Sequence, residues 1–277
     1  MATILTIDLG KYKSVACIFD SLTGEYSFKS IPTTPCVLES LFSSESPDRI
    51  VIEVGSQAGW IADLAESLEI EIQVANPSSE AWLWKNVTRK TDRDDALRLA
   101  QMSIMGNMSV VHMPKKNTRQ WRGLIAFRNK LISRRTAIKN SIRSILDQQG
   151  ISWPSGRAGW TKQTLQNLKV YCVGEDDESA ELWHVQIAVE YESLLHAEQM
   201  VKSVEQKLDA LAKADERVAR LRTIPGVGPR LAEIVVAIID DPHRFRNGKQ
   251  VGAYAKHSAD LVFLMAVHRR CGITLRC

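Results

Sequence analysis

Four acidic residues from three separate segments are the side chains best suited to metal-assisted chemistry. Asp8 lies in ILTIDLG and Glu53 lies in IVIEVGS, within apolar, β-branched runs that predict buried strands. Asp92 and Asp95 lie in KTDRDDALRLA, three residues apart on one face of an expected helix. A carboxylate in a buried strand is paired, neutralised or bound to metal. Because carboxylates suit Mg²⁺ and paired ions assist phosphodiester displacement, the set predicts a divalent-metal site for phosphodiester chemistry.

Each acid also has an ordinary structural explanation. Asp8 could begin a turn before the glycine that follows it, and Glu53 could lie at the solvent-facing end of a strand. Asp92 and Asp95 suit the N-terminal end of a helix, where the helix dipole favours negative charge. Asp94, between them, points elsewhere and is better explained by this helix-start role. The metal-site prediction therefore depends on whether the fold brings the four acids together.

Hydrophobic periodicity predicts three strands in a meander, followed by strands that alternate with helices. The order is typical of the ribonuclease-H-like fold, an α/β mixed sheet with helices on both faces. In that fold the ends of two strands and the start of a later helix converge, which would gather the four acids. The expected strands are 3–8, 14–19, 26–31, 49–54 and 71–75, and the expected helices are 35–42, 58–68 and one from about 91 to 105.

The second half of the chain is expected to be helical. Residues 117–149 predict one long basic helix and 179–214 a second, separated by the irregular segment 150–177. The two form an expected antiparallel helical pair or coiled coil. The stretch 220–239, with IPGVGP, predicts a C-terminal helix-hairpin-helix α domain. The predicted domains are 1–112, 113–215 and 216–277.

Several residues in this half could contact nucleic acid. Glycines before a helix N-terminus let the backbone approach a phosphate, and arginines on a basic helix could follow a nucleic-acid backbone. A solvated helix face and packing between hairpin helices are the alternatives. Trp82, Trp84 and Trp121 could stack on bases or pack in a core. The candidate contacts are Gly226, Gly228, Arg230, Arg128, Arg134 and Arg135.

Composition limits the broad class of protein to which the chain can belong. The 277 residues are 44% hydrophobic and 25% charged, with a formal net charge of +4, which is globular and mildly basic. The apolar runs are too short to span a bilayer, and the N-terminus has neither a basic region nor a cleavage site. Five scattered cysteines without a CxxC motif predict a reduced, cytoplasmic protein. Cys271 and Cys277 have no assigned role.

Together, IDLGKYKSVACIFD, the Glu53 strand, KTDRDDALRLA and IPGVGPRLAEIVVAIIDDPHRFRNGKQVGAYA resemble the DEDD transposases of the insertion-sequence one-ten group. These are similar to pilin-gene invertases, and the resemblance covers about residues 3–255. It implies a RuvC-like domain in which Asp8, Glu53, Asp92 and Asp95 are the catalytic acids and bind Mg²⁺. It also implies an enzyme that moves or inverts DNA segments, is guided by a structured noncoding RNA and acts as a homo-oligomer, a dimer or tetramer.

The chain departs from this family after Ala255. Family members continue with a leucine-proline stretch and a Ser-Gly, whose serine forms a covalent link to DNA. Here the tail is KHSADLVFLMAVHRRCGITLRC, and Ser258 precedes Ala259, so the nucleophile role is not assigned to it. We expect a truncated or frameshifted end, which leaves open whether this copy is active.

Two alternatives to an active transposase remain at this point. One is a nucleic-acid-binding remnant without catalysis. The other is an actin-like or sugar-kinase ATPase, which also begins with a strand and DLG. Such ATPases need a second phosphate-binding turn, and the sequence contains no second DxG of that kind.

Overall fold

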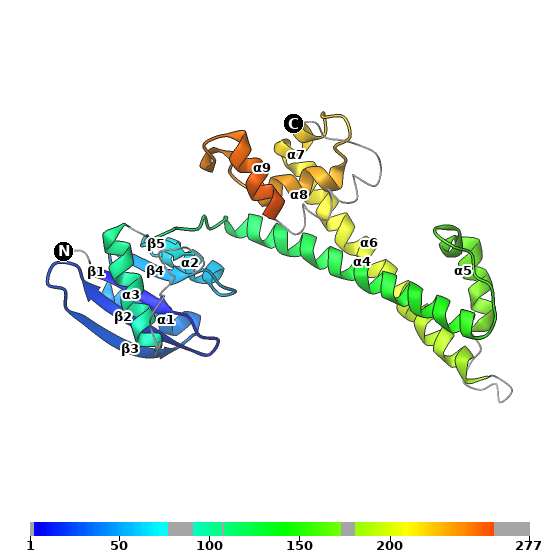
Figure 1. Cartoon of the computed structure of the whole chain (residues 1–277), viewed down its shortest axis with the longest axis horizontal. Helices are drawn as coiled ribbons and strands as arrows, with labels where there is room; N and C mark the ends of the chain where they lie inside the picture. Colours follow the sequence, from blue (N-terminus) through cyan, green and yellow to red (C-terminus); the bar gives the residue numbers. More distant parts are fainter. Residues whose placement is uncertain (1–2, 77–90, 107, 173–180, 258–277) are drawn as a thin grey trace. The chain divides into compact units, whose positions relative to one another are not determined.

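The chain forms two compact units, Met1–Lys116 and Asn117–Cys277. The computed structural model describes residues 3–76, 91–106, 108–172 and 181–257 (Figure 1). Each unit is described by itself below. The predicted division into three domains stays a prediction.

The first unit contains a five-stranded mixed sheet in the order β3-β2-β1-β4-β5. The central strand β1 pairs antiparallel with β2 and parallel with β4. At the edges, β3 is antiparallel to β2, and β5 is parallel to β4. This order confirms the predicted ribonuclease-H-like sheet. The strands are β1 (Thr3–Asp8), β2 (Lys13–Asp20), β3 (Tyr26–Pro32), β4 (Arg49–Glu53) and β5 (Glu71–Ala75).

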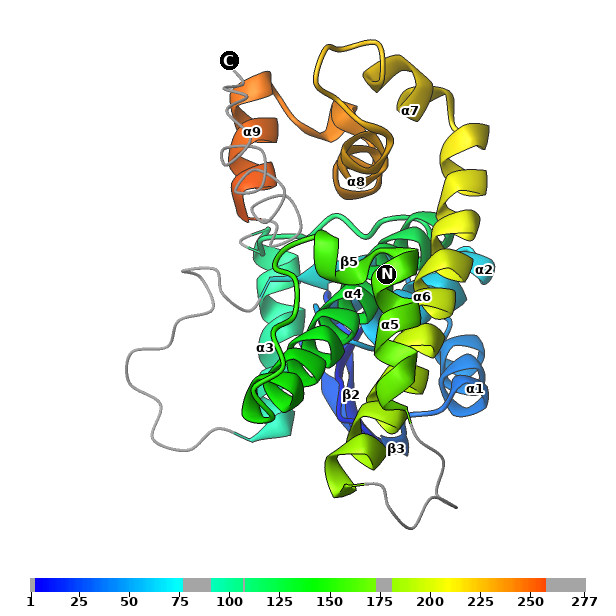
Figure 2. The same ribbon diagram turned by 90° about the vertical axis from the view of Figure 1, so that its right-hand side faces the viewer.

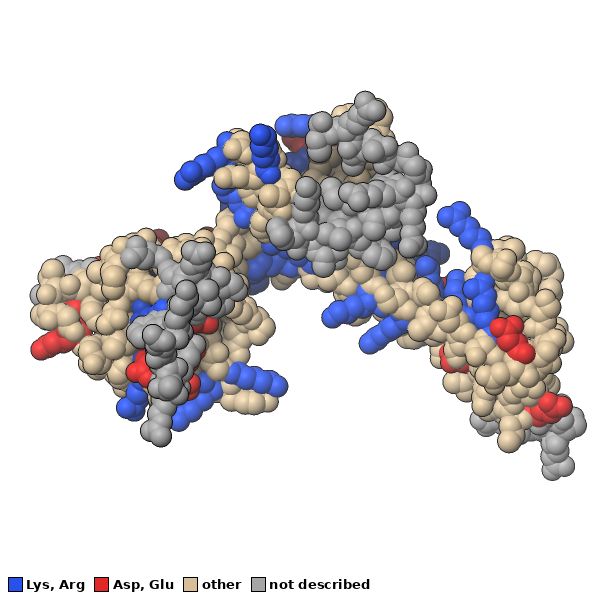
Figure 3. Space-filling model, in the orientation of Figure 1, with Lys and Arg blue, Asp and Glu red and all other residues tan. Residues whose placement is uncertain are grey.

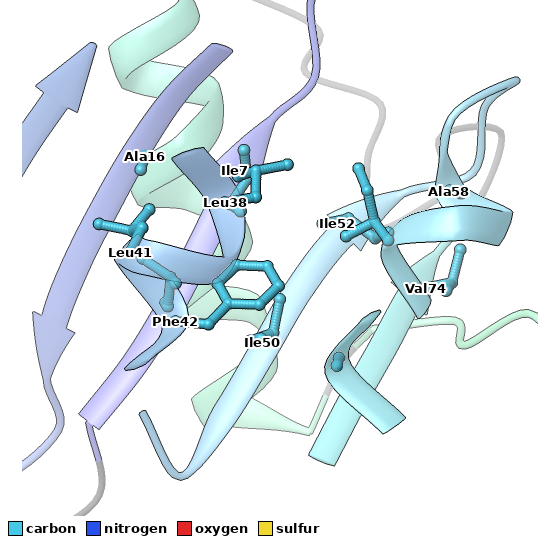
Figure 4. Packing of buried hydrophobic residues seen from close by; sticks show 12 residues of the cluster. Ile7, Ala16, Leu38, Leu41, Phe42, Ile50, Ile52, Ala58 and Val74 are labelled. Atoms are coloured by element: carbon cyan, nitrogen blue, oxygen red, sulfur yellow. The ribbon is translucent and has the colours of Figure 1, made fainter. Parts of the chain in front are cut away.

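Helices cover both faces of the sheet, as predicted. Successive residues of a strand point to opposite faces, so β1 contributes to two cores. Ile7 packs with Phe42 of α1 (Pro35–Glu45) on one face (Figure 4), and Leu5 belongs to the same buried cluster. Ile4 packs with Leu99 of α3 on the other face. The helices of this unit are α1 (Pro35–Glu45), α2 (Ala58–Ser67) and α3 (Asp92–Met105).

The second unit is built on two long helices that lie side by side in both ribbon views (Figures 1 and 2). Arg128 forms an ion pair with Glu205 at 2.6 Å, and Ser141 donates a hydrogen bond to Glu190 at 2.6 Å. Residue numbers rise along one helix as they fall along the other, so the pair is antiparallel, as predicted. The helices are α4 (Lys116–Gln148) and α6 (Leu182–Ala214).

The predicted first long helix is basic, but it also carries a buried apolar face. Leu131 and Ile142 are buried, because this face packs on neighbouring helices. Trp121 is also buried, in a cluster with residues of α6 and of the later helix α8 (Pro229–Ile239). Core packing rather than base stacking therefore explains its position. Trp82 and Trp84 lie outside the described residues.

The segment 150–177, predicted to be irregular, contains a short helix, α5 (Lys162–Leu168). Thr161 caps its N-terminus by accepting a hydrogen bond from the Thr164 amide at 3.2 Å. Leu168 is buried with residues of α4 and α6. A helix this short shows too little periodicity to be recognised in the sequence, and tertiary packing stabilises it. The 3₁₀ turns Ala158–Trp160 and Lys169–Tyr171 flank it.

Two helices follow around the predicted glycine turn. Gly226 has a φ of 83°, a conformation that favours glycine. Gly228 is the N-cap of the second helix, and Pro229 is its first residue, where a missing N–H costs nothing. The helices are α7 (Glu216–Leu221) and α8 (Pro229–Ile239), followed by the 3₁₀ turn Pro242–Arg244 and by α9 (Gly248–His257).

In the described part of the chain, no helix is both long and apolar enough to cross a membrane. Cys17, Cys36 and Cys172 are free thiols. Ser258 and the tail cysteines Cys271 and Cys277 lie outside the described residues.

Candidate functional site

Asp8 and Glu53 lie at the ends of neighbouring parallel strands. The β1–β4 register pairs Ile7 with Ile52, so the two acids occupy the next position of each strand and point to the same face. Both line a pocket of about 430 Å³, within the range of about 300–1,000 Å³ typical of ligand sites. The other residues that line it are Leu9, Lys11, Val54, Gly55, Ser56 and Gln57.

Helix α3 covers this same face of the sheet, with its N-terminus toward the strand ends. The buried Thr6 donates a hydrogen bond from Oγ1 to the Ala96 carbonyl oxygen, near the start of α3, at 2.5 Å. At the opposite end of the sheet, Arg49 donates to Oγ of Ser103 at 3.4 Å. Asp8 lies two residues after Thr6 and therefore shares its face. The start of α3 thus approaches the sheet edge that carries the pocket.

The first turn of α3 is fixed by a capping box. The Asp94 amide donates to Thr91 Oγ1 at 3.3 Å, and Asp94 Oδ2 accepts from the Thr91 amide at 3.3 Å. This confirms the helix-start explanation of Asp94. Asp92 and Asp95 lie in the same turn but outside the box, the first exposed and the second half-buried.

Removing the Thr91 cap measures how much the capping box contributes to the stability of the first unit. Thr91→Ala should lower the free energy of unfolding of the first unit by about 1 kcal/mol, because it leaves helix N–H groups without an acceptor. Urea unfolding followed by circular dichroism tests this. Thr136→Ala, at an exposed position inside α4, is the matched control and should change stability by less than about 0.5 kcal/mol. Equal losses in both variants would contradict the capping role.

The structure places two predicted acids in one pocket and the other two at the start of the helix over that face. Among the described residues, no group of three or more His, Cys, Asp and Glu side chains could hold a metal ion. Mg²⁺ is usually held by one or two carboxylates together with water and phosphate oxygens. Asp8 and Glu53 therefore fit such an ion as a pair. The metal roles of all four acids, Asp92 and Asp95 included, stay predictions.

Two of the predicted nucleic-acid contacts take part in ion pairs within the chain. Arg128 pairs with Glu205. Arg230 pairs with Glu233 at 3.0 Å and with Asp209 at 2.7 Å. The acidic partners lie far away in sequence or on a buried face, so the basic pattern alone gave no sign of them. Phosphate binding by these arginines stays a prediction.

The remaining candidate contacts are accessible. Arg134 is exposed and Arg135 is half-buried on α4, and Gly226 and Gly228 are both exposed in the turn before α8. Figure 3 shows Lys and Arg side chains projecting along the long helical segment. These positions could meet a phosphate backbone without breaking an ion pair described in the structure.

Sequence reasoning missed two polar residues of the pocket, Lys11 and Gln57. Lys11 belongs to the turn directly after β1, and Gln57 is the N-cap of α2, which follows β4. Each therefore comes a few residues after a strand that ends in an acid. Ligand sites often gather at such strand ends, and that position was the signal available.

The sheet order, with carboxylates at the ends of two adjacent strands, is that of a ribonuclease-H-like chain. Residues 5–151 match the family model of the IS110 DEDD transposases, whose description is "Transposase". Residues 218–256 match a second model, "Transposase IS116/IS110/IS902 family". The first match covers more than half of the chain, so the chain belongs to the IS110 family of DEDD transposases.

Curated relatives agree with this assignment. The chain is 27% identical over 195 residues to the "Transposase for insertion sequence element IS1111A" of Coxiella burnetii, covering 68% of this chain and 52% of that protein. It is 26% identical over 227 residues to the "Putative transposase y4pF/y4sB" of Sinorhizobium fredii, covering 82% of this chain and 53% of that protein. The chain thus spans about half the length of these relatives.

Among solved structures, the chain is similar to the Thermus thermophilus RuvC structure, with 12% identity over 39% of this chain and 99% of that chain. The TM-score of this match is 0.28. The strand order and the pairing of the sheet define the fold.

Proposed function

We propose that this chain is the transposase of an insertion sequence, a site-specific DNA recombinase that cleaves and transfers DNA strands with Mg²⁺. The observation that carries the proposal is the pocket shared by Asp8 and Glu53 at adjacent strand ends, in a chain of the transposase family. Family membership argues against the actin-like ATPase.

The residues of the chain hold and orient the reacting groups. Asp8 and Glu53 are fixed by paired strands, so their carboxylates need little reorganisation to bind a cation. When bound, the divalent ion supplies charge stabilisation to the phosphodiester and activates the attacking oxygen. Asp92 and Asp95 extend the acidic surface from the facing helix.

The partners belong to the same proposal. Element ends and target DNA are the substrates, a structured noncoding RNA guides their choice, and the chain works in the cytoplasm as a dimer or tetramer. The family match supports the DNA substrate. The exposed arginines of α4 and the glycine turn before α8, acting as a helix-hairpin-helix, suit contacts to phosphates.

The test is an assay of DNA processing by the purified chain. The probe is DNA of the element ends, incubated with or without the flanking noncoding RNA, in Mg²⁺ or in EDTA. We expect cleaved or joined products that need both Mg²⁺ and the RNA. Binding without products would favour the nucleic-acid-binding remnant, and the absence of both binding and products would overturn the proposal.

A further inference from the structure

The acidic pocket contains a basic side chain, Lys11, beside Asp8 and Glu53. A phosphodiester is repelled by carboxylates, so a pocket that admits DNA needs positive charge from side chains as well as from metal. Lys11 is exposed, and its ammonium lies 5.0 Å from the centroid of the Tyr12 ring. A lysine ammonium is a compact charge on a flexible stem and binds phosphate oxygens well.

The backbone that carries Lys11 is held from two sides. Gln57 Nε2 donates hydrogen bonds to the Lys11 carbonyl oxygen at 3.2 Å and to that of Gly10 at 3.5 Å. Thr33 Oγ1 donates to the Gly10 carbonyl oxygen at 2.9 Å, and the Thr33 amide donates to the Tyr12 carbonyl oxygen at 2.9 Å. The start of α2 and the residue after β3 therefore fix the turn at the pocket.

Two further features show how tightly this turn is constrained. A side chain at Gly10 would overlap the Lys13 carbonyl oxygen, so the close turn needs glycine. The two carbonyl acceptors require the amide nitrogen of Gln57 to face them. Its Oε1 is consequently buried without a hydrogen-bond partner among the described residues.

We propose that Lys11 binds a phosphodiester oxygen of the DNA at the acidic pocket, and that Gln57 is the positioning residue that holds the Lys11 turn in place. The inference rests on the proposed function for the identity of the substrate. The inference adds Lys11 as a phosphate contact, and Gln57 as the residue that positions it, to the acidic residues of the pocket.

The first test separates Lys11 from a neighbouring lysine of equal charge. Lys11→Met is compared with Lys13→Met, because Lys13 is also exposed but does not line the pocket. Binding of a fluorescein-labelled DNA duplex is measured over a salt series without divalent metal. Lys11→Met should reduce the slope of log K against log salt by about 0.9, the loss of one phosphate contact. Lys13→Met should leave the slope unchanged.

The second test concerns Gln57. In Mg²⁺-dependent processing, Lys11→Met should lower kcat by roughly 100-fold, as expected for loss of one group that stabilises transition-state charge. Gln57→Met should lower kcat in the same direction by a smaller factor, with little change in KM. The double variant should be no slower than Lys11→Met, because Gln57 acts through Lys11. Thermal unfolding of each variant checks that the fold is retained.

The outcomes distinguish this inference from the proposed function. If both lysine variants change the slope equally, or the double variant shows additive losses, the assignments to Lys11 and Gln57 are wrong, whatever the wild type does. If the wild type binds DNA without processing it, and only Lys11→Met changes the slope, the proposed catalysis fails and the phosphate contact stands. A wild type that binds no DNA refutes both.

Discussion

Asp8→Asn is expected to abolish Mg²⁺-dependent DNA processing, with a rate at least ~10³-fold below wild type, which corresponds to about 4 kcal/mol of activation free energy. Asparagine keeps the size of the side chain but removes the negative charge that a hard cation prefers. Glu53→Gln should have the same effect, because the two acids line one pocket from paired strands. Single-turnover cleavage, together with Mg²⁺ titration by calorimetry, measures both changes.

The matched control is Asp94→Asn, which removes one charge from the start of α3. Asp94 belongs to the capping box with Thr91 and lies outside the acidic pocket. This variant should lose about 1 kcal/mol of stability and keep its rate. Asp8→Asn that folds normally and processes DNA at the wild-type rate would exclude Asp8 as a metal ligand.

Arg230→Met should strongly destabilise the second unit, with a loss of about 3–5 kcal/mol at neutral pH. Glu233 is 1% exposed and forms an ion pair with Arg230 at 3.0 Å. Without Arg230, this buried carboxylate loses its hydrogen-bonded cation. Urea unfolding at a fixed protein concentration measures the loss. Arg134→Met, at an exposed position on α4, should change stability by less than about 0.5 kcal/mol.

The loss of folding stability in Arg230→Met should depend on pH in a defined direction. Burial raises the pKa of Glu233 above its ordinary value, while Arg230 opposes that shift, so the pKa should rise further in Arg230→Met. Between the ordinary and the raised pKa, the folded chain keeps a proton that the unfolded chain has lost. Stability therefore falls as the pH rises through this window and stays low above it. The loss in Arg230→Met should shrink as the pH falls toward the ordinary glutamate pKa.

A second substitution shows whether the buried Glu233 charge causes the loss of stability in Arg230→Met. Adding Glu233→Gln to Arg230→Met removes the unpaired charge, so the double variant should be more stable than Arg230→Met at neutral pH and should lose most of its pH dependence. A double variant that is as unstable as the single one would show that packing of Arg230, rather than the buried charge of Glu233, stabilises α8.

The sequence by itself determined the order of the elements and the positions of two acids. The apolar, β-branched runs in 3–8 and 49–54 predict buried strands. The acids that end these strands must reach one edge of the sheet if the strands are parallel neighbours. The turn signals between segments fixed the meander. The short helix α5 escaped notice because its stability comes from contacts distant in sequence.

Only the tertiary structure decided which charged groups meet. The β1–β4 register brings Lys11 and Gln57 into the pocket of Asp8 and Glu53, and no spacing along the chain encodes that register. Arg128 and Arg230 resemble other surface arginines in the sequence, yet both form ion pairs with acids on α6. Electrostatic interactions decline with distance in space, not along the chain, so their partners emerge only once the helices have packed.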